Sequence, residues 1–206
     1  IELNAGNNQD ALSLLIKATE SDPQLAPAWG NLANGYVQLG KTQEAEICIS
    51  KSIELKPTLF NSHFLLATIL LKQKKPQEAE KPLRTTIELN PNFADAHYNL
   101  GNILRELGRL QEAEISTRKA IEINPDLTEG HCLLGKIFSA QNKLQEAERF
   151  TRKAIELNPN LFNSHFLLGS ILLEQKKLQE AEQHLRKTIQ LKPDFFQAHL
   201  NLGLAL

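Results

Sequence analysis

Apolar residues recur along this chain at helical spacing, in short runs separated by polar turns. Between Gln9 and Glu20 they stand at positions 11, 12, 14, 15 and 18, which places them on one side of a helix. The next segment gives two helices, roughly Pro27–Leu39 and Thr42–Leu55, and the same pattern continues to the end of the chain. Ile1–Ala5 is expected to be the tail of a preceding helix that Gly6 ends. The pattern predicts an all-α protein.

The predicted helices are joined by a recurring segment that contains proline. Prolines stand at positions 23, 57, 91, 125, 159 and 193, and consecutive members are always 34 residues apart. A fixed period between about 20 and 50 residues indicates a repeat protein, which grows by stacking similar units. We therefore predict a single solenoid over residues 1–206, in which each complete repeat holds two helices. The complete repeats are Ala26–Leu59, Phe60–Phe93, Ala94–Leu127, Thr128–Leu161 and Phe162–Phe195, with partial repeats at 1–25 and 196–206.

Small residues recur where the two helices of a repeat must approach closely. In the third repeat, Gly101 lies on the apolar side of the first helix and Ala113 on that of the second. Larger side chains there would widen the usual spacing of about 8–10 Å between packed helices. One helix pair cannot bury both of its apolar faces, so the repeats are expected to stack. The matching pairs are Ala33 with Ala45, Ala67 with Ala79, Gly135 with Ala147, and Gly169 with Ala181.

The ends of the predicted helices carry recognisable signals. Two sites have the spacing of a capping box, Asp126 with Glu129 and Asp194 with Gln197. Three further N-cap positions hold Thr58, Asn92 and Asn160. The turn inside each repeat is expected to contain a left-handed residue, at Gly40, Lys74, Gly108, Asn142 and Lys176. Pro82 lies inside the second helix of Phe60–Phe93 and predicts a kink there.

Composition excludes several classes of function. The formal net charge is −1, so a nucleic-acid partner is not expected. The longest strongly apolar run, Phe64–Leu71, is far shorter than the roughly 20 residues that span a bilayer. Cys48 and Cys132 occupy different places in their repeats, which favours a reducing, cytoplasmic location without a disulfide framework. Methionine is absent even at position 1, which indicates a fragment of a longer polypeptide that could self-associate through uncapped ends.

Histidines at one register of the repeat invite a metal-binding hypothesis. They are His63, His97, His131, His165 and His199. They stand on different repeats, at least about one helix diameter apart, whereas zinc ligands all lie within about 2.3 Å of one ion. In the first complete repeat the same register holds Trp29, which cannot bind a metal. The position is therefore predicted to pack a flat ring, and no metal is expected.

Paired glutamates, such as Glu112 and Glu114, recur near the start of every second helix. Two carboxylates can perform acid–base catalysis, but negative charge at this place also complements the helix dipole. The sequence contains no phosphate-binding loop, no dinucleotide glycine motif, and neither GxSxG nor HExxH. We therefore expect no enzymatic activity and no cofactor.

The repeated residues resemble the tetratricopeptide repeat family. In the first complete repeat the matching residues are Trp29, Leu32, Ala33, Tyr36, Ala45 and Pro57. In the third repeat they are His97, Leu100, Gly101, Ala113, Ala120 and Pro125. The resemblance covers essentially the whole chain. It implies a right-handed superhelix of antiparallel helix pairs, whose first helices line a concave groove that binds a peptide or a partner's helix.

The resemblance also implies which side chains face the groove. At its centre we expect Tyr98, Asn102, Arg105 and Lys136, where two cations meet an amide and an aromatic ring. The flanking repeats contribute Asn34, Phe64, Leu71, Phe166 and Leu173. An apolar stripe with a few convergent polar groups suits peptide recognition. The alternative is that the tyrosine and asparagines are ordinary consensus residues of the family.

These features predict a non-catalytic scaffold that binds a protein or peptide in its groove. The array is also similar to the repeats of O-linked N-acetylglucosamine transferases and of bacterial transferases fused to such repeats. That similarity gives an alternative, the substrate-recognition arm of a glycosyl- or sulfotransferase whose catalytic domain lies outside this chain. Asn31, Asn99 and Asn201 match the asparagine series of those transferases, but Leu65, Leu133 and Leu167 interrupt it.

Overall fold

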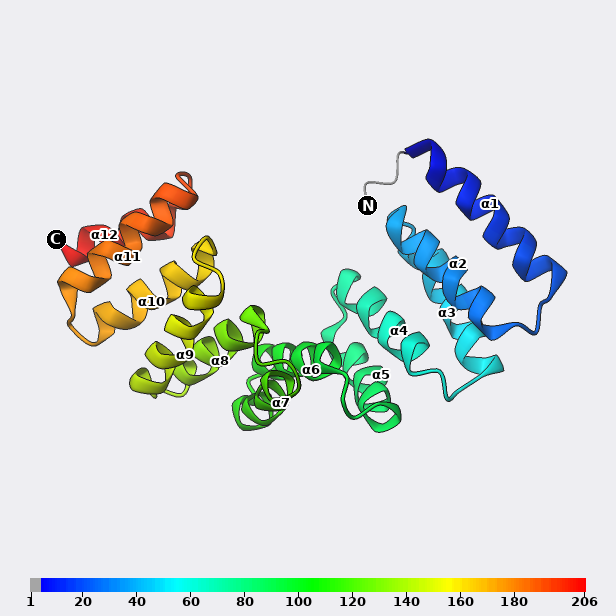
Figure 1. Cartoon of the computed structure of the whole chain (residues 1–206), viewed down its shortest axis with the longest axis horizontal. Coiled ribbons are helices and arrows are strands. Elements are labelled where there is room, and N and C mark those ends of the chain that lie inside the picture. Colours follow the sequence, from blue (N-terminus) through cyan, green and yellow to red (C-terminus); the bar gives the residue numbers. More distant parts are fainter. Residues whose placement is uncertain (1–4) are drawn as a thin grey trace. The chain divides into compact units, whose positions relative to one another are not determined.

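The computed structural model describes residues 5–206, with side chains from residue 9 onward. Every regular element in this part of the chain is an α-helix, as the apolar spacing predicted. The helices are α1 (Ala5–Ser21), α2 (Ala26–Gln38), α3 (Thr42–Leu55), α4 (Phe60–Lys72), α5 (Pro76–Leu89), α6 (Ala94–Glu106), α7 (Leu110–Ile123), α8 (Thr128–Ala140), α9 (Leu144–Leu157), α10 (Phe162–Glu174), α11 (Leu178–Leu191) and α12 (Phe196–Ala205) (Figure 1).

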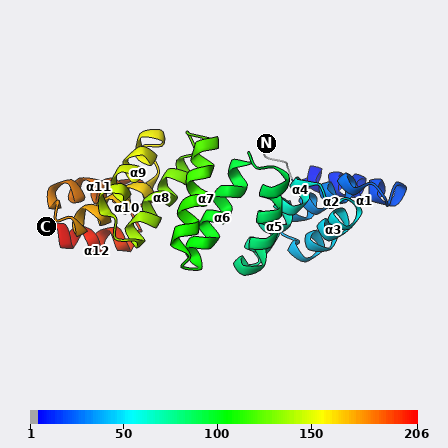
Figure 2. The same ribbon diagram turned by 90° about the horizontal axis from the view of Figure 1, so that it is seen from below.

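The helices pack as consecutive pairs. α2 lies against α3, α4 against α5, α8 against α9, and α10 against α11 (Figures 1 and 2). The contacts divide the chain into two compact units, one reaching Ala96 and one spanning His97–Leu206. Within each unit the first helices of neighbouring repeats also touch, α2 with α4 and α8 with α10. Side chains of the first helices are thus brought together along one side of each unit.

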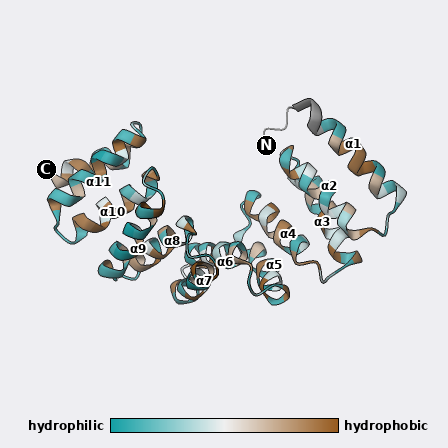
Figure 3. Ribbon diagram, viewed as in Figure 1, coloured by the Kyte–Doolittle hydropathy of each residue, from teal (hydrophilic) through white to brown (hydrophobic). Residues whose placement is uncertain are grey.

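Most helices bury one side, which explains why their sequences are amphipathic, whereas α8 is buried over most of its surface, from Gly130 to Phe138. Figure 3 shows apolar and polar residues alternating along the same helices. In the first unit, Leu32, Ile49 and Ile69 are buried in one cluster that joins α2, α3 and α4. In the second unit, Leu168, Leu172 and Leu185 form the equivalent cluster between α10 and α11. The core is therefore a series of small layers between helices, each completed by the next helix along the chain.

The small residues lie where the helices come closest, as predicted. Ala45, Ala79, Ala113, Ala147 and Ala181 are all fully buried. A Cβ atom added to Gly101 would overlap the Thr117 hydroxyl, and one added to Gly169 would lie 2.8 Å from Leu185 Cγ. Close approach at these positions holds the second helix against the first.

The turns inside the repeats have the predicted left-handed backbone. The residues with positive φ are Gly40 (73°), Lys74 (61°), Gly108 (76°), Asn142 (59°) and Lys176 (61°). Glycine adopts this conformation without a steric penalty, whereas a residue with a Cβ atom pays about 1–2 kcal/mol. The two lysine turns are therefore strained sites that the packing of their helices maintains.

Two predictions about helix ends were wrong. α1 begins at Ala5 and passes through Gly6, so Gly6 does not end a helix, and the tail predicted for residues 1–4 lies outside the described residues. Glycine is tolerated here because it falls in the first turn, where few intrahelical bonds depend on it.

The capping boxes do not form either. The N-cap residues of α8 and α12 are Leu127 and Phe195, and the N-caps of α4 and α10 are Leu59 and Leu161, all without a side-chain cap bond. Each helix starts one residue later than the sequence signal implied. Two of the predicted cap residues, Asp126 and Asn160, instead donate their backbone amides to an asparagine side chain in the preceding turn. Asn124 Oδ1 accepts a hydrogen bond from the Asp126 amide at 3.3 Å, and Asn158 Oδ1 accepts one from the Asn160 amide at 3.1 Å.

Candidate functional site

The predicted groove residues all lie on first helices of the repeats. Asn34 is on α2, Phe64 and Leu71 on α4, Tyr98, Asn102 and Arg105 on α6, Lys136 on α8, and Phe166 and Leu173 on α10. Asn34 and Lys136 are exposed, and the other seven side chains are partly buried. Three of them, close together along α6, interact with one another.

These three residues, Tyr98, Asn102 and Arg105, form a loose polar cluster on α6. An Arg105 terminal nitrogen (Nη2) donates to Asn102 Oδ1 at 3.5 Å and lies 3.7 Å from Glu106 Oε1. Asn102 Nδ2 in turn donates to Glu106 Oε1 at 3.4 Å. Arg105 Nε is buried and has no hydrogen-bond partner among the described residues. The long contacts and the unused Nε leave the guanidinium with spare donor capacity.

Tyr98 lies beside groups from two helices. Burial raises the pKa of its hydroxyl, the Glu129 carboxylate and Cys132 raise it further, and the Arg105 guanidinium opposes them. The phenol is therefore neutral at physiological pH and available as a hydrogen-bond donor. Because Glu129 and Cys132 are on α8, the surroundings of Tyr98 join the third and fourth repeats.

A hollow lies between α2 and α4 in the first unit. It has a volume of about 500 Å³, and Asn31, Asn34, Phe64 and Thr68 are among the side chains that line it. Gly30 leaves space in this hollow because it has no side chain. A Cβ atom at Gly30 would meet nothing closer than Ser52 Oγ at 3.6 Å. The register position of Gly30 holds Phe64, Tyr98, Cys132 and Phe166 in the following repeats.

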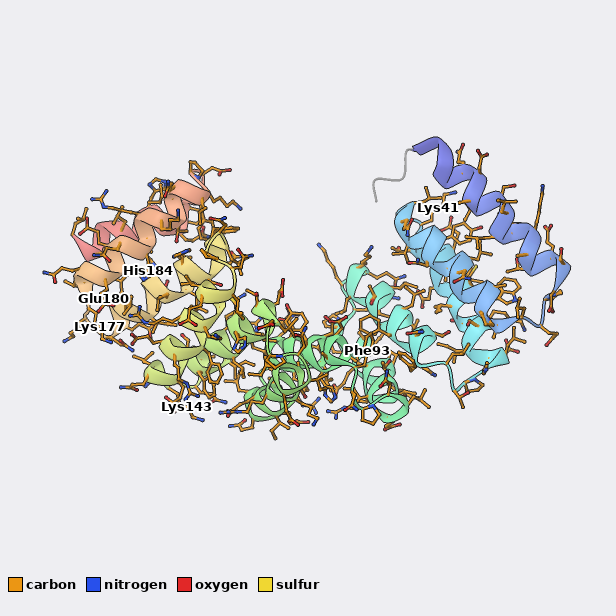
Figure 4. The ribbon with its side chains drawn as sticks, in the orientation of Figure 1. Lys41, Phe93, Lys143, Lys177, Glu180 and His184 are labelled. Carbon is orange, nitrogen blue, oxygen red and sulfur yellow. The ribbon has the colours of Figure 1, made fainter. Side chains whose placement is uncertain are left out.

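Phe64 and Phe166 also take part in aromatic packing. Phe64 lies edge-on to Phe93, with ring centroids 4.7 Å apart, and Phe166 meets Phe195 in the same way at 4.9 Å. Phe93 is labelled in Figure 4, at the end of the second repeat. One edge of each ring is therefore used to join a first helix to the end of its own repeat, and only the remainder can contact a ligand.

The ring positions at the start of each repeat are hydrogen-bonded, a feature that the repeat pattern alone did not predict. His63, His131, His165 and His199 place Nε2 2.8–2.9 Å from a proline carbonyl six residues earlier, and Trp29 Nε1 does the same at 3.0 Å. A carbonyl only accepts, so Nε2 must carry the proton. The presence of both histidine and tryptophan at one register was the available signal, because these rings share an N–H donor. The positions therefore lock the joint between repeats.

His165 makes a second contact, with a histidine of α11. Its Nδ1 lies 3.0 Å from Nδ1 of His184, and the rings are stacked with centroids 5.3 Å apart. Because His165 Nε2 already donates to Pro159, its Nδ1 must accept the proton that His184 Nδ1 donates. Figure 4 labels His184 together with its neighbours Glu180 and Lys177. Protonating both rings would place two positive charges in contact.

We expect this histidine pair to make the fold sensitive to mild acid. Burial, the His165 ring and Arg152 lower the pKa of His184, and Glu180 opposes them. The pKa of His184 in the folded chain is below the unfolded value of about 6.5. The stability contributed by the neutral His184 ring is therefore complete above pH 6.5 and is lost as the pH falls. The urea midpoint should therefore drop between pH 8 and pH 5.5. His184→Asn, which keeps a donor near Nδ1, should reduce the drop, whereas the control His199→Gln should retain it. Equal drops in both variants would contradict this assignment.

The second glutamate of each pair forms an ion pair within its own helix in α5, α7, α9 and α11. Each of four glutamates contacts an arginine one turn later, at 2.8–3.0 Å, in the pairs Glu80–Arg84, Glu114–Arg118, Glu148–Arg152 and Glu182–Arg186. Burial raises the pKa of Glu148, but hydrogen bonds from Lys177 and Arg152 outweigh it and lower the value to about 2. The stability that the ionised Glu148 contributes to the fold is present above the unfolded pKa of about 4.3 and is lost only in strong acid.

The described residues contain no group of three or more metal-binding side chains. Within the same part of the chain, no helix is long and apolar enough to cross a membrane.

Comparisons with known proteins agree with this geometry. Residues 1–158 match the family model described as the C-terminal domain of cilia and flagella-associated protein 70. Residues 150–183 and 169–206 match two further models, of a tetratricopeptide repeat and a TPR repeat. A search of curated protein sequences found no match.

Solved structures with the same fold are numerous, and three represent them. YrrB, described as a TPR protein with an unusual peptide-binding site, is 21% identical with a TM-score of 0.79, over 92% of this chain and 98% of that one. MamA is 23% identical with a TM-score of 0.70, over 77% and 97%. PilF of Pseudomonas aeruginosa is 23% identical with a TM-score of 0.78, over 87% and 82%. The predicted all-α fold of helix pairs with a 34-residue repeat is confirmed.

Proposed function

Because the chain belongs to the tetratricopeptide repeat family, we propose that it is a non-catalytic scaffold that binds a peptide segment of a partner protein along its first helices. The observation that carries this proposal is the hollow between α2 and α4, where amides of Asn31 and Asn34 stand beside the apolar wall of Phe64. Amide side chains can pair with both donors and acceptors of a peptide backbone, and an apolar wall accepts a side chain. YrrB, of similar fold, is described as having a peptide-binding site.

The polar cluster on α6 is proposed as a second point of contact, together with Lys136 on α8. Arg105 has only long contacts and could bind a carboxylate or carbonyl of the peptide in a bidentate manner, which lysine would not reproduce. Lys136 is exposed and adds positive charge that steers an acidic segment. Leu71, Phe166 and Leu173 supply partly buried apolar surface for the remaining side chains of the peptide. Neither the matching family models nor the similar structures support the transferase-arm alternative.

The test begins with peptides selected for binding to the whole chain from a displayed library, and measures their affinity for two variants. Gly30→Phe should fill the hollow with the ring that Phe64 supplies at the same register, and affinity should fall at least about tenfold. Removing a glycine from a helix interior should also raise stability by about 0.5 kcal/mol, so lost binding would not reflect unfolding.

Arg105→Ala should weaken the same peptides, with a larger effect at low salt, because a desolvated charge pair costs about 2–5 kcal/mol when truncated. Arg186→Ala on α11 is a control, since its Nε pairs with Glu182 on its own helix at 2.8 Å. If Gly30→Phe and Arg105→Ala both leave affinity within about twofold, or roughly 0.4 kcal/mol, the groove is not the binding site.

A further inference from the structure

The exposed side of α3 carries a second hollow, which shares no lining residue with the one between α2 and α4. It has a volume of about 670 Å³ and is lined by Trp29 of α2 together with residues of α3. Ile47 lines it with 70% of its surface exposed, and Ile115 at the same register of the third repeat is exposed to a similar degree, 69%. Glu46 and Glu54 also line the hollow. The site therefore combines apolar surface with carboxylates.

The first repeat differs from the others at one charged position on this side. In the four following repeats, an arginine one turn after the glutamate pairs with it, as in Glu80–Arg84 and Glu114–Arg118. In α3 the arginine register holds Ser50, whose hydroxyl donates to the backbone carbonyl of Glu46 at 2.7 Å instead of to its carboxylate. Glu46 is therefore present without the arginine that pairs with the equivalent glutamate in the other complete repeats.

Nothing else in the described part of the chain supplies a cation to Glu46. Its Oε2 accepts a hydrogen bond from Gln73 Nε2 at 2.8 Å, and no ion pair reaches it. Lys75 stands at the register where Lys143 and Lys177 approach their glutamates at 3.7 and 2.9 Å, but it does not pair with Glu46. The nearby Lys51 is occupied with Glu54 at 3.1 Å. One face of the Glu46 carboxylate is thus free to bind a cation from outside.

We propose that this side of α3 binds an arginine side chain of a partner protein. The guanidinium pairs with Glu46 in the position that Arg84, Arg118, Arg152 and Arg186 occupy in their own repeats, and an apolar side chain next to it covers Ile47 and Trp29. Charge complementarity argues for this ligand, because in each of the other four complete repeats an arginine pairs with the equivalent glutamate. Arginine rather than lysine is expected, since its planar fork matches a carboxylate.

This site can be probed separately from the peptide groove, because the two hollows have different lining residues. Trp29 is the single tryptophan of the chain and lines the hollow on α3, which makes its fluorescence a direct reporter. The probe is the blocked peptide acetyl-Leu-Arg-Leu-amide, titrated into the whole chain at low salt. Its control is the same peptide with citrulline, which keeps the shape of arginine without the charge.

We expect the arginine peptide to change Trp29 emission saturably and the citrulline peptide to bind at least about tenfold more weakly. Ser50→Arg should occupy the position from within and weaken the arginine peptide by a similar factor, while its urea midpoint stays at or above that of the wild type. Glu46→Gln should also weaken it. The matched control Glu80→Gln, which alters the equivalent acid of the second repeat, should leave affinity within about twofold.

The proposal is overturned if the arginine peptide gives no saturable change with the wild type, if citrulline binds equally well, or if Ser50→Arg binds like the wild type. Gly30→Phe should not affect this titration. The arginine site on α3 and the peptide groove can therefore each be disproved without affecting the other.

Discussion

Gly135→Leu should lower the free energy of unfolding by about 1–3 kcal/mol, the range expected when a tightly packed site is overfilled. A Cβ atom at Gly135 would overlap the Thr151 hydroxyl and lie 3.2 Å from Leu167 Cδ2 and 3.4 Å from the Ala147 carbonyl oxygen. Thr151 cannot simply turn away, because its hydroxyl donates to the Ala147 carbonyl at 2.7 Å and is fully buried. The helices α8 and α9 would have to separate.

The chain contains a matched control for this substitution. Gly203 stands at the same register in α12, and a Cβ atom there would meet no atom within 4 Å among the described residues. Gly203→Leu should leave the urea midpoint unchanged or slightly raised, because leucine has the higher helix propensity. Urea unfolding followed by circular dichroism measures both. A midpoint for Gly135→Leu equal to that of Gly203→Leu would mean that close approach of the helices does not determine stability.

The close approach at Gly135 is a feature that the sequence predicts. The 34-residue period places Gly135 opposite Ala147 because stacking of identical pairs leaves only one register for a small residue. The left-handed turns at Lys74 and Lys176 are predicted for the same reason, since the period assigns them to the position that Gly40 fills. Features shared by all repeats can therefore be read from the amino-acid sequence, because each repeat supplies independent evidence for them.

Features that depend on one atom pair could not be predicted in this way. The capping boxes were wrong because the N-cap residues are Leu127 and Phe195, one residue after the predicted aspartates, and residue spacing alone does not resolve a shift of one residue. The hydrogen bond from His131 to the Pro125 carbonyl needs the path of the backbone around the joint, which periodicity does not give. The groove residues remain proposals for a similar reason. Their place on the first helices follows from the repeat register, but what they bind depends on a partner.

The second large effect is expected at Pro82, in the interior of α5, where Pro82→His should stabilise the chain by up to about 3 kcal/mol at pH 8. Proline lacks the amide that would bond to the Glu78 carbonyl, and its ring crowds that carbonyl. α5 nevertheless runs unbroken from Pro76 to Leu89 with Pro82 buried, so packing offsets the defect. The similar repeat Phe162–Phe195 carries His184 at this register, which shows that the fold accommodates an imidazole there.

A second variant separates the two possible causes of the gain in stability, the restored amide and the added imidazole ring. Pro82→Ala restores the amide without adding a ring, so it should recover most of the stability at every pH. Pro82→His would also place an imidazole beside His63, whose Nε2 already bonds to the Pro57 carbonyl, and so recreate the contact seen between His165 and His184. Its advantage should therefore shrink between pH 8 and pH 5.5, because protonating both rings is unfavourable. Urea midpoints at the two pH values decide the matter. A midpoint for Pro82→Ala at or below that of the wild type would show that the missing amide costs the folded chain nothing.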